Sequence, residues 1–240
     1  MLKKTLGLAL AGALALSLVG VAYAQVSNTT MDLSFSAKPA KSGTKKKPKP
    51  VKLNLGIEQA TVNGQGQPPT STSLKITLPK GLKWNGKSWA KGKRCSPTKA
   101  NQAQSDNVCP KGSKVGKGLT IATAVGTTEN LTVSAFVTTS GNLGLFLKGE
   151  PLPIAQMLEG KVKGRVITVK IPLGIQQPVP GVKSAIQTLR FGLTGTTKVK
   201  GKKRGVIEST GCTGKKWTLK FENIVEGGKL TDTKSVACKK

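Results

Sequence analysis

The chain has 240 residues, of which 39 are Lys or Arg and 10 are Asp or Glu, so its formal net charge is +29. Only four basic residues are arginine, and the chain has no histidine. A chain without histidine has no Ser-His-Asp triad, no Cys-His nucleophile pair and no His-bearing metal centre. We therefore expect a protein that is not an enzyme and that has no cofactor and no metal site.

The first 24 residues are typical of a secretory signal peptide. Lys3 and Lys4 precede an apolar run over residues 6–21, and Ala22-Tyr23-Ala24 then forms an A-x-A cleavage site. The run is too short for a stable membrane span, and we expect no transmembrane segment in the rest of the chain. Cleavage after Ala24 would lower the net charge from +29 to +27. The expected product, residues 25–240, is a bacterial protein that is extracellular or associated with the cell envelope.

Residues 38–50, KPAKSGTKKKPKP, combine proline, glycine and lysine. Such a segment cannot bury a core and its charges repel one another, which predicts a mobile arm or a hairpin loop. As an arm it would hold the protein to an anionic surface, at about 1 kcal/mol per basic residue near acidic lipid headgroups. The alternative is a solvated loop that only keeps the protein soluble. The lysines in question are Lys45, Lys46, Lys47 and Lys49.

Apolar residues recur with a period of two along most of the chain after residue 50. Successive side chains on a strand point to opposite faces, so this pattern indicates half-buried antiparallel strands. The fold class is therefore predicted as all-β, an antiparallel β-sandwich of about ten strands. The sequence is compatible with one large sandwich and with two packed sandwiches joined near residues 149–153. The alternating segments begin near Val51, Leu74, Leu119, Leu131, Leu143, Ile167, Leu189 and Trp217.

Asn85-Gly86 is a strong signal for a type I′ hairpin. In that register Trp84 and Trp89 lie on one face, beside Lys83 and Lys87. Such a pair of indoles could stack on a sugar while the lysines hold an anionic polymer, which predicts a carbohydrate-binding or adhesive module. The alternative is that both rings cover the edge of the core, because aromatic side chains bury a large area.

Cys95, Cys109, Cys212 and Cys238 all follow the signal peptide, and an even number of cysteines in an oxidising compartment predicts two disulfides. Four cysteines allow three pairings. We favour Cys95 with Cys109 and Cys212 with Cys238 because each pair closes a short loop, which contributes roughly 3 kcal/mol in the chain-entropy model. A zinc site would need closer cysteine spacing or histidine.

The stretch CPKGSKVGKG at 109–118 does not match a phosphate-binding loop. Gly112 and Gly116 are one residue too close together, Gly118 stands where a hydroxyl is needed, and a strand-like segment follows instead of a helix. We interpret it as a turn that leaves the first disulfide loop and starts a strand, with the glycines at positive φ.

Two further catalytic patterns are weak. Serine-lysine matches such as Ser96 with Lys99 agree in number with chance, and no helical pattern follows them. Glu222 and Glu226 would share a strand face at roughly 13 Å, whereas the paired carboxylates of glycosidases lie about 5 to 9.5 Å apart. A hydrolase that uses an unseen carboxylate pair remains a third hypothesis.

Several motifs resemble those of a group of uncharacterised secreted proteins of actinobacteria. They are CPKGSKVGKG after LPKGLKWNGKSWAKGKRC, then IPLGIQQPVPGVKSAIQTL, STGCTGKKWTLKF and the terminal VACKK. The resemblance covers most of the chain after the signal peptide. It implies a β-sandwich, export and two local disulfides, and it implies no catalytic residue.

The leading hypothesis is an exported, non-enzymatic structural or binding protein that associates by charge with anionic polymers of the cell envelope or the extracellular space, or with polysaccharide. Lysine is a hydrated point charge that suits diffuse, salt-sensitive attraction better than planar recognition. Nucleic acid is disfavoured as a partner because single-strand binders interleave aromatic residues with their charges, and this chain has few. Besides the lysines at 45–49, the expected polyanion contacts are Lys202, Lys203 and Arg204.

Overall fold

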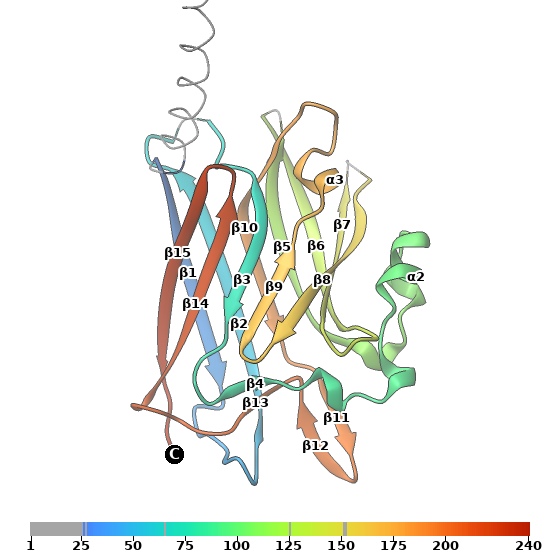
Figure 1. Cartoon of the computed structure of the whole chain (residues 1–240), viewed down its shortest axis with the longest axis vertical. Coiled ribbons are helices and arrows are strands. Elements are labelled where there is room, and N and C mark those ends of the chain that lie inside the picture. The colour runs from blue at the N-terminus through green and yellow to red at the C-terminus, as the bar shows by residue number, and fades with distance from the viewer. Residues whose placement is uncertain (1–25, 27, 65, 125, 151–152) are drawn as a thin grey trace, which may run out of the picture.

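The computed structural model describes residues 26, 28–64, 66–124, 126–150 and 153–240 (Figure 1). The expected signal peptide, with its cleavage site after Ala24, lies outside the described residues. Within the described part, no helix is long and apolar enough to cross a membrane.

Antiparallel strands make up most of the described chain, with two short helices, α2 (Pro97–Gln102) and α3 (Leu173–Gln176). The strands are β1 (Thr29–Lys38), β2 (Lys49–Thr61), β3 (Ser71–Thr77), β4 (Leu82–Trp84), β5 (Lys114–Ala124), β6 (Thr127–Val137), β7 (Leu143–Glu150), β8 (Ala155–Lys163), β9 (Val166–Lys170), β10 (Ser184–Leu193), β11 (Thr196–Val199), β12 (Lys202–Gly205), β13 (Ile207–Ser209), β14 (Lys216–Val225) and β15 (Gly228–Ala237).

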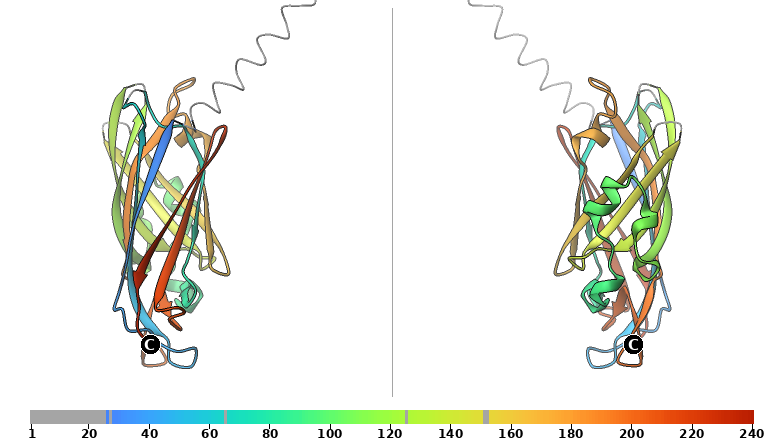
Figure 2. Two further views of the ribbon diagram at one scale, coloured as in Figure 1. Left: turned by 90° about the vertical axis from the view of Figure 1, so that its left-hand side faces the viewer. Right: turned by 90° about the vertical axis from the view of Figure 1, so that its right-hand side faces the viewer.

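Thirteen of these strands form one sheet in the order β15-β14-β3-β9-β8-β7-β6-β5-β10-β2-β13-β4, with β1 also paired to β2. The sheet folds over on itself, so that β14 and β3 face β2 and β10 across the core (Figures 1 and 2). The backbone N–H of Leu33 in β1 donates to Asp232 Oδ2 of β15 at 2.9 Å, which joins the two layers along one side. The predicted all-β antiparallel sandwich is confirmed.

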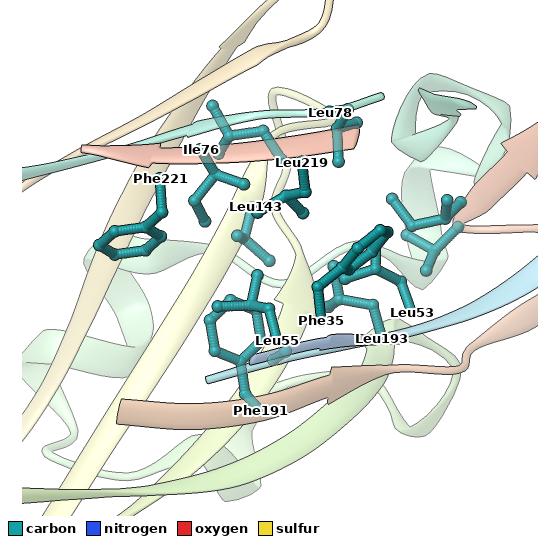
Figure 3. Packing of buried hydrophobic residues seen from close by; sticks show 14 of the residues in the cluster. Phe35, Leu53, Leu55, Ile76, Leu78, Leu143, Phe191, Leu193, Leu219 and Phe221 are labelled. Atoms are coloured by element: carbon teal, nitrogen blue, oxygen red, sulfur yellow. The ribbon is translucent and has the colours of Figure 1, made fainter. Parts of the chain in front are cut away.

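The core lies between the layers, and the predicted alternation accounts for it. Every second residue of β2, from Val51 to Ile57, is buried, and the same holds for Leu189–Leu193 of β10 and Trp217–Val225 of β14. Figure 3 shows Leu55 and Phe191 of one layer facing Ile76 and Phe221 of the other. Because one face of each layer is apolar and the other polar, period-two segments bury their apolar side between the layers.

Besides β4, which fell in the predicted hairpin, six strands lie outside the segments predicted from sequence: β1, β8, β11, β12, β13 and β15. β1 is paired to β2 off the main strand order, and β15 begins that order and carries mostly exposed polar side chains. In β8 the neighbours Met157 and Leu158 are both buried, which breaks the alternation. Met157 is buried on the outer face because α2 and the loop around it cover that face.

The expected joint near 149–153 is a connection within one sheet. β7 and β8 pair along Leu143–Lys148 and Ala155–Gly160, and the Gly149 N–H donates to Ile154 O at 2.9 Å. Residues 151–152 lie outside the described part. Since strands from both sides of this connection belong to one sheet and one core cluster, the structure is one sandwich.

Both predicted disulfides are present, Cys95–Cys109 and Cys212–Cys238. The first closes a loop that packs Cys95 and Ala100 against Phe136 and Phe146 on the outer face of the sheet. Within this loop Ser96 caps α2, and its Oγ accepts from the Lys99 N–H at 3.3 Å. The expectation that no helix follows Ser96 is wrong, and the serine has a structural role as an N-cap.

Candidate functional site

The lysine-rich segments of the sequence come together at one end of the sandwich, the lower end in Figure 1. Residues 38–50, 79–94, 196–216 and 238–240 form this end, and we call it the lysine end. They contain six, six, seven and two basic residues, 21 in all, and one acidic residue, Glu208. Because antiparallel strands alternate in direction, every second connection lies at the same end of the sheet, and segments far apart in the sequence meet there.

The connections at the opposite end carry little charge. Their described residues are 62–64, 66–70, 124, 126–127, 153–154, 171–183 and 226–227, and among these Lys183 and Glu226 are the charged ones. Lys183 Nζ and Glu226 Oε2 lie 2.5 Å apart, so the two charges pair. We call this the neutral end.

The backbone of residues 39–48 is tied to the C-terminal residues. The Ser42 N–H donates to Lys239 O at 2.7 Å, and the Lys239 N–H donates to Ala40 O at 2.9 Å. The Gly43 N–H donates to Ser209 Oγ at 2.8 Å. A Cβ at Gly43 would lie only 2.6 Å from the Lys49 backbone nitrogen, so glycine permits this close approach. Of the two predicted alternatives, the structure therefore contains the hairpin loop, between β1 and β2, and not the arm.

Other parts of the lysine end are braced in the same way. β13 pairs with both β2 and β4, and the Thr210 N–H donates to Gly81 O at 2.6 Å. The Cys212–Cys238 disulfide then holds the C-terminal residues beside this small ladder. These contacts make the lysine end a braced platform that carries charged side chains.

Six of the seven predicted polyanion contacts are exposed on this platform. An open groove of about 830 Å³ lies beside them, between residues 211–215 and 238–240, and Lys215, Lys239 and Lys240 line it. The sequence analysis did not single out these three lysines, because their grouping depends on the disulfide. The exposed predicted residues are Lys45, Lys46, Lys47, Lys49, Lys202 and Lys203.

Arg204, the seventh predicted polyanion contact, is partly buried and paired with an internal carboxylate. Glu208 is fully buried, and Arg204 binds it through two hydrogen bonds, of 2.5 Å from Nε and 2.8 Å from Nη2. Lys83 Nζ lies 3.6 Å from the same carboxylate, because Lys83 and Glu208 are cross-strand neighbours in β4 and β13. The hydrogen bond to Glu208 raises the pKa of Arg204. These two cations therefore neutralise an internal carboxylate.

The predicted Asn85-Gly86 hairpin is also wrong. Residues 82–84 form β4 and pair with β13, and Gly86–Ser88 is a single 3-10 turn. A Cβ at Gly86 would clash with the Gly141 carbonyl and the Trp84 indole, so this glycine is needed for close packing and not for a hairpin turn.

The two indoles consequently do not form an exposed platform. Trp89 is 2% exposed, and its Nε1 donates to Gly112 O at 3.0 Å. Trp84 is half-buried, and its Nε1 donates to Gly141 O at 2.7 Å. Lys87 is exposed, but no open pair of rings lies beside it. Both rings brace the segment and belong to the edge of the core.

The stretch at 109–118 is a turn that leads into β5, as predicted, but its glycines have another role. Gly112, Gly116 and Gly118 all have ordinary negative or extended φ values. A Cβ at Gly116 or Gly118 would clash with a carbonyl oxygen of β10. The two strand glycines therefore allow β5 to lie close to β10.

The acidic residues form separate ion pairs instead of a catalytic pair. Glu222 lies on the outer face of the sheet, 3.3 Å from Lys75 and Lys220 and 3.2 Å from Lys229. Burial opposes its ionisation, but the hydrogen bonds from the lysines outweigh burial and hold the pKa of Glu222 below its ordinary value. Glu226 is paired with Lys183 at the neutral end.

Glu159 is the other carboxylate with a shifted pKa. Burial opposes its ionisation, but hydrogen bonds from Ser140, Thr138 and Asn142 lower the pKa. The same Thr138 and Asn142 side chains also bond the backbone of the β6–β7 turn and of β8, so the group stabilises that turn. Within the described residues, no group of Asp, Glu and Cys side chains is placed to hold a metal ion.

The comparisons with known proteins leave the family open. No family model matches the chain, and no curated protein matches it. A crystal structure of the N-terminal domain of the Streptococcus gordonii adhesin Sgo0707 is similar over 89% of this chain and 33% of that chain, with 12% identity and a TM-score of 0.34. This chain thus spans about a third of that structure, and so low a TM-score carries no argument. The resemblance to secreted actinobacterial proteins stays a prediction.

Proposed function

We propose that the protein is a non-enzymatic, exported binding module that attaches to anionic polymers of a cell envelope through the lysine end. The observation that carries the proposal is the segregation of charge, with 21 basic residues and one buried acidic residue in the segments of that end. Two disulfides suit a protein that works in an oxidising compartment.

The arrangement of the lysine end favours a long, flexible polyanion over a small anion. Its exposed cations are lysines spread over four segments, and Arg204 and Lys83 are occupied by Glu208. Point charges at many positions attract any dense line of negative charge, whereas a compact anion would need convergent donors. The expected partners are therefore polyphosphate-like or polyuronate-like chains, bound in a salt-sensitive way.

The bracing of the platform supports the same proposal. Because the backbone of residues 38–50 is held by the C-terminal residues and Ser209, binding does not require the loop to become ordered. Ordering costs of about 1 to 2 kcal/mol per residue are therefore avoided. The carbohydrate hypothesis built on Trp84 and Trp89 has no such support, since the rings are packed into the structure.

The test is binding of residues 25–240 to long-chain polyphosphate, with neutral dextran as the comparison polymer. We expect binding to polyphosphate that falls steeply as NaCl rises from about 0.05 to about 0.5 M, as screening shortens the reach of each charge. Dextran should not bind. Salt-independent binding to polyphosphate, or no binding at low salt, would contradict the proposal.

A triple variant locates the site. Lys45→Gln, Lys46→Gln and Lys47→Gln together should weaken polyphosphate binding roughly 100-fold, at about 1 kcal/mol per charge. The matched control removes three exposed lysines from the sheet faces, by Lys117→Gln, Lys148→Gln and Lys161→Gln. Both variants have the same net charge, so equal losses would mean that overall charge, and not the lysine end, attracts the polymer.

A further inference from the structure

A cavity of about 50 Å³ lies between the two layers of the sandwich, toward the neutral end. Eleven of its fourteen lining residues are aliphatic, and both layers contribute, for example through Leu74, Leu131, Leu147, Leu158 and Leu189. The segment that contains α3 closes it from outside, through Ile171, Ile175 and Ser184. The cavity is separate from the lysine end and plays no part in the proposed polymer binding.

The cavity exists because the core changes composition along the strands. None of the eight aromatic residues after residue 25 lines it. On β10 Leu189 borders the cavity, whereas Phe191, two residues closer to the lysine end, fills the core below it together with Phe221 (Figure 3). Aliphatic side chains alone leave the upper part of the interior incompletely filled.

The polar groups of the wall are already satisfied. Thr120 Oγ1 donates to Thr188 O at 2.7 Å, and Ser184 Oγ donates to Ile175 O at 2.5 Å. Ser71 Oγ accepts from Asn223 Nδ2 at 2.9 Å. A water molecule in a cavity needs two to four polar partners, and apolar cavities that lack them stay dry and take up apolar molecules.

An outer cleft of about 370 Å³ adjoins the cavity, and Ile175 of α3 lines both. The cleft lies between the end of α2, the start of β8 and α3, and none of its lining residues is charged. Its polar lining consists of the amides of Asn101, Gln104 and Gln156. Ile175 is thus the partition between a neutral polar cleft and an apolar interior.

The partition rests on a short element. α3 is a single turn, held by the Ser184 hydrogen bond and by Gln176 Nε2, which donates to Ile171 O at 2.6 Å. Three large apolar side chains are exposed in the connections of the neutral end, Val62 at 59%, Leu173 at 64% and Val179 at 48%. An apolar chain that approaches this end therefore meets apolar surface before it reaches Ile175.

We propose that the neutral end binds one aliphatic chain of a neutral amphiphile. The chain passes Ile175 and occupies the cavity, and a hydroxyl or amide head stays in the cleft beside Gln104 and Gln156. A charged head is disfavoured because the cleft supplies no opposite charge.

The experiment uses residues 25–240 with labelled Ile, Leu and Val methyl groups, titrated with 1-butanol, 1-hexanol and 1-octanol at about 0.5 M NaCl, where polymer-type charge attraction is screened. We expect saturable chemical-shift changes at Ile175, Leu131 and Leu158, and none at Leu53 and Leu193 near the lysine end. Affinity should rise about fourfold per added methylene until the cavity is full. Unsaturable shifts, or shifts spread evenly over both ends, would overturn the proposal.

Two variants with opposite effects sharpen the test. Ala122→Leu adds three carbon atoms to the wall and should weaken 1-octanol binding roughly 60-fold, because the added carbons displace as many from the ligand. Ile175→Ala removes the partition and should strengthen binding.

If Ala122→Leu does not fold, Ile175→Trp is the second variant, and its larger side chain at the partly exposed position 175 should block entry of the ligand. Lys46→Gln is the control and should leave 1-octanol binding unchanged; unchanged binding in Ala122→Leu or in Ile175→Trp would refute the site.

Discussion

The two ends of this sandwich are built from connections of the same strands and differ in almost every physical property. The lysine end is highly charged, braced by a disulfide and by backbone hydrogen bonds, and backed by a core that contains Trp89, Trp217 and Phe191. The neutral end has one ion pair, exposed apolar side chains and an aliphatic interior with a cavity.

This difference shows how an antiparallel fold can separate two tasks. A strand carries its two flanking connections to opposite ends, so charge placed in alternate connections accumulates at one end. Repulsion among lysines there is tolerated because the platform beneath them is held by bonds that do not depend on charge. The other end, free of that repulsion, can leave apolar groups exposed. The following predictions test whether the two ends are independent.

The largest expected effect is on the bracing of the lysine end. Replacing Cys212 and Cys238 together by Ala removes a cross-link across a sequence separation of 26 residues, which should lower the free energy of unfolding by about 3.5 kcal/mol. Urea unfolding measures this loss. Hydrogen exchange should speed up at residues 39–48 and 238–240 and stay unchanged at β7 and β8.

The control for this variant is the double change Cys95→Ala and Cys109→Ala. That disulfide spans 14 residues, so the loss should be similar, about 3 kcal/mol. Faster exchange should then appear within residues 95–109 and not in the β1–β2 loop. Unchanged protection of residues 39–48 after loss of Cys212–Cys238 would show that the C-terminal residues do not brace the lysine end.

An intermediate effect is expected from the buried carboxylate of the lysine end. Glu208→Gln keeps the side-chain shape but removes the charge that Arg204 and Lys83 neutralise, so stability should fall by about 2 kcal/mol. The same change frees two cations for the polymer, and affinity for polyphosphate should rise about 30-fold at about 1 kcal/mol per charge. Thermal unfolding and polymer titration at low salt measure the two effects.

Glu226→Gln is the matched control, because it raises the net charge by the same amount at the neutral end. It should leave polyphosphate affinity nearly unchanged. Equal gains in the two variants would mean that net charge alone controls binding and that the separation of the two ends has no functional consequence.

The smallest effect concerns the sheet face between the ends. The lysines around Glu222 hold its pKa below the ordinary value of 4.5, so the folded protein gains stability above that pH and loses it as pH falls through the lowered pKa. Glu222→Gln should therefore cost about 1 kcal/mol near neutral pH and nothing at the acid end of the range. Urea unfolding between about pH 7 and pH 3 measures the difference. A cost that does not change with pH would show that the carboxylate charge is not the stabilising feature.

Much of the fold could be predicted from local pattern. The alternation at Val51–Ile57 and at Trp217–Phe221 predicted core strands, since one face of a strand must be apolar for a sandwich to form. The sequence allowed three cysteine pairings and favoured the two that close short loops, which the structure contains. β8 could not be predicted in this way, because burial of Met157 depends on α2, which lies more than fifty residues earlier.

The candidate sites could be predicted less well, because each depends on a distant partner. In the sequence, Arg204 stands among lysines and therefore resembles an exposed surface cation. Only the pairing of β13 with β4 brings Lys83 to Glu208, the buried carboxylate that Arg204 also binds. Trp89 has lysines near it in the sequence, which suggested an exposed ring. In the structure the ring is buried, and its N–H donates to the distant Gly112 carbonyl.

By itself, the sequence determined that this chain makes antiparallel strands and that it is strongly basic, because alternation and charge are properties of neighbouring residues. It favoured local cysteine pairs, and the structure decided among the three possible pairings. Only the tertiary structure decided that four lysine-rich segments share one end and that an aliphatic cavity lies toward the other. The physical reason is that the end reached by a connection depends on how many strands come before it. Omitting β1 or β8 from that count assigns the connections that follow it to the wrong end.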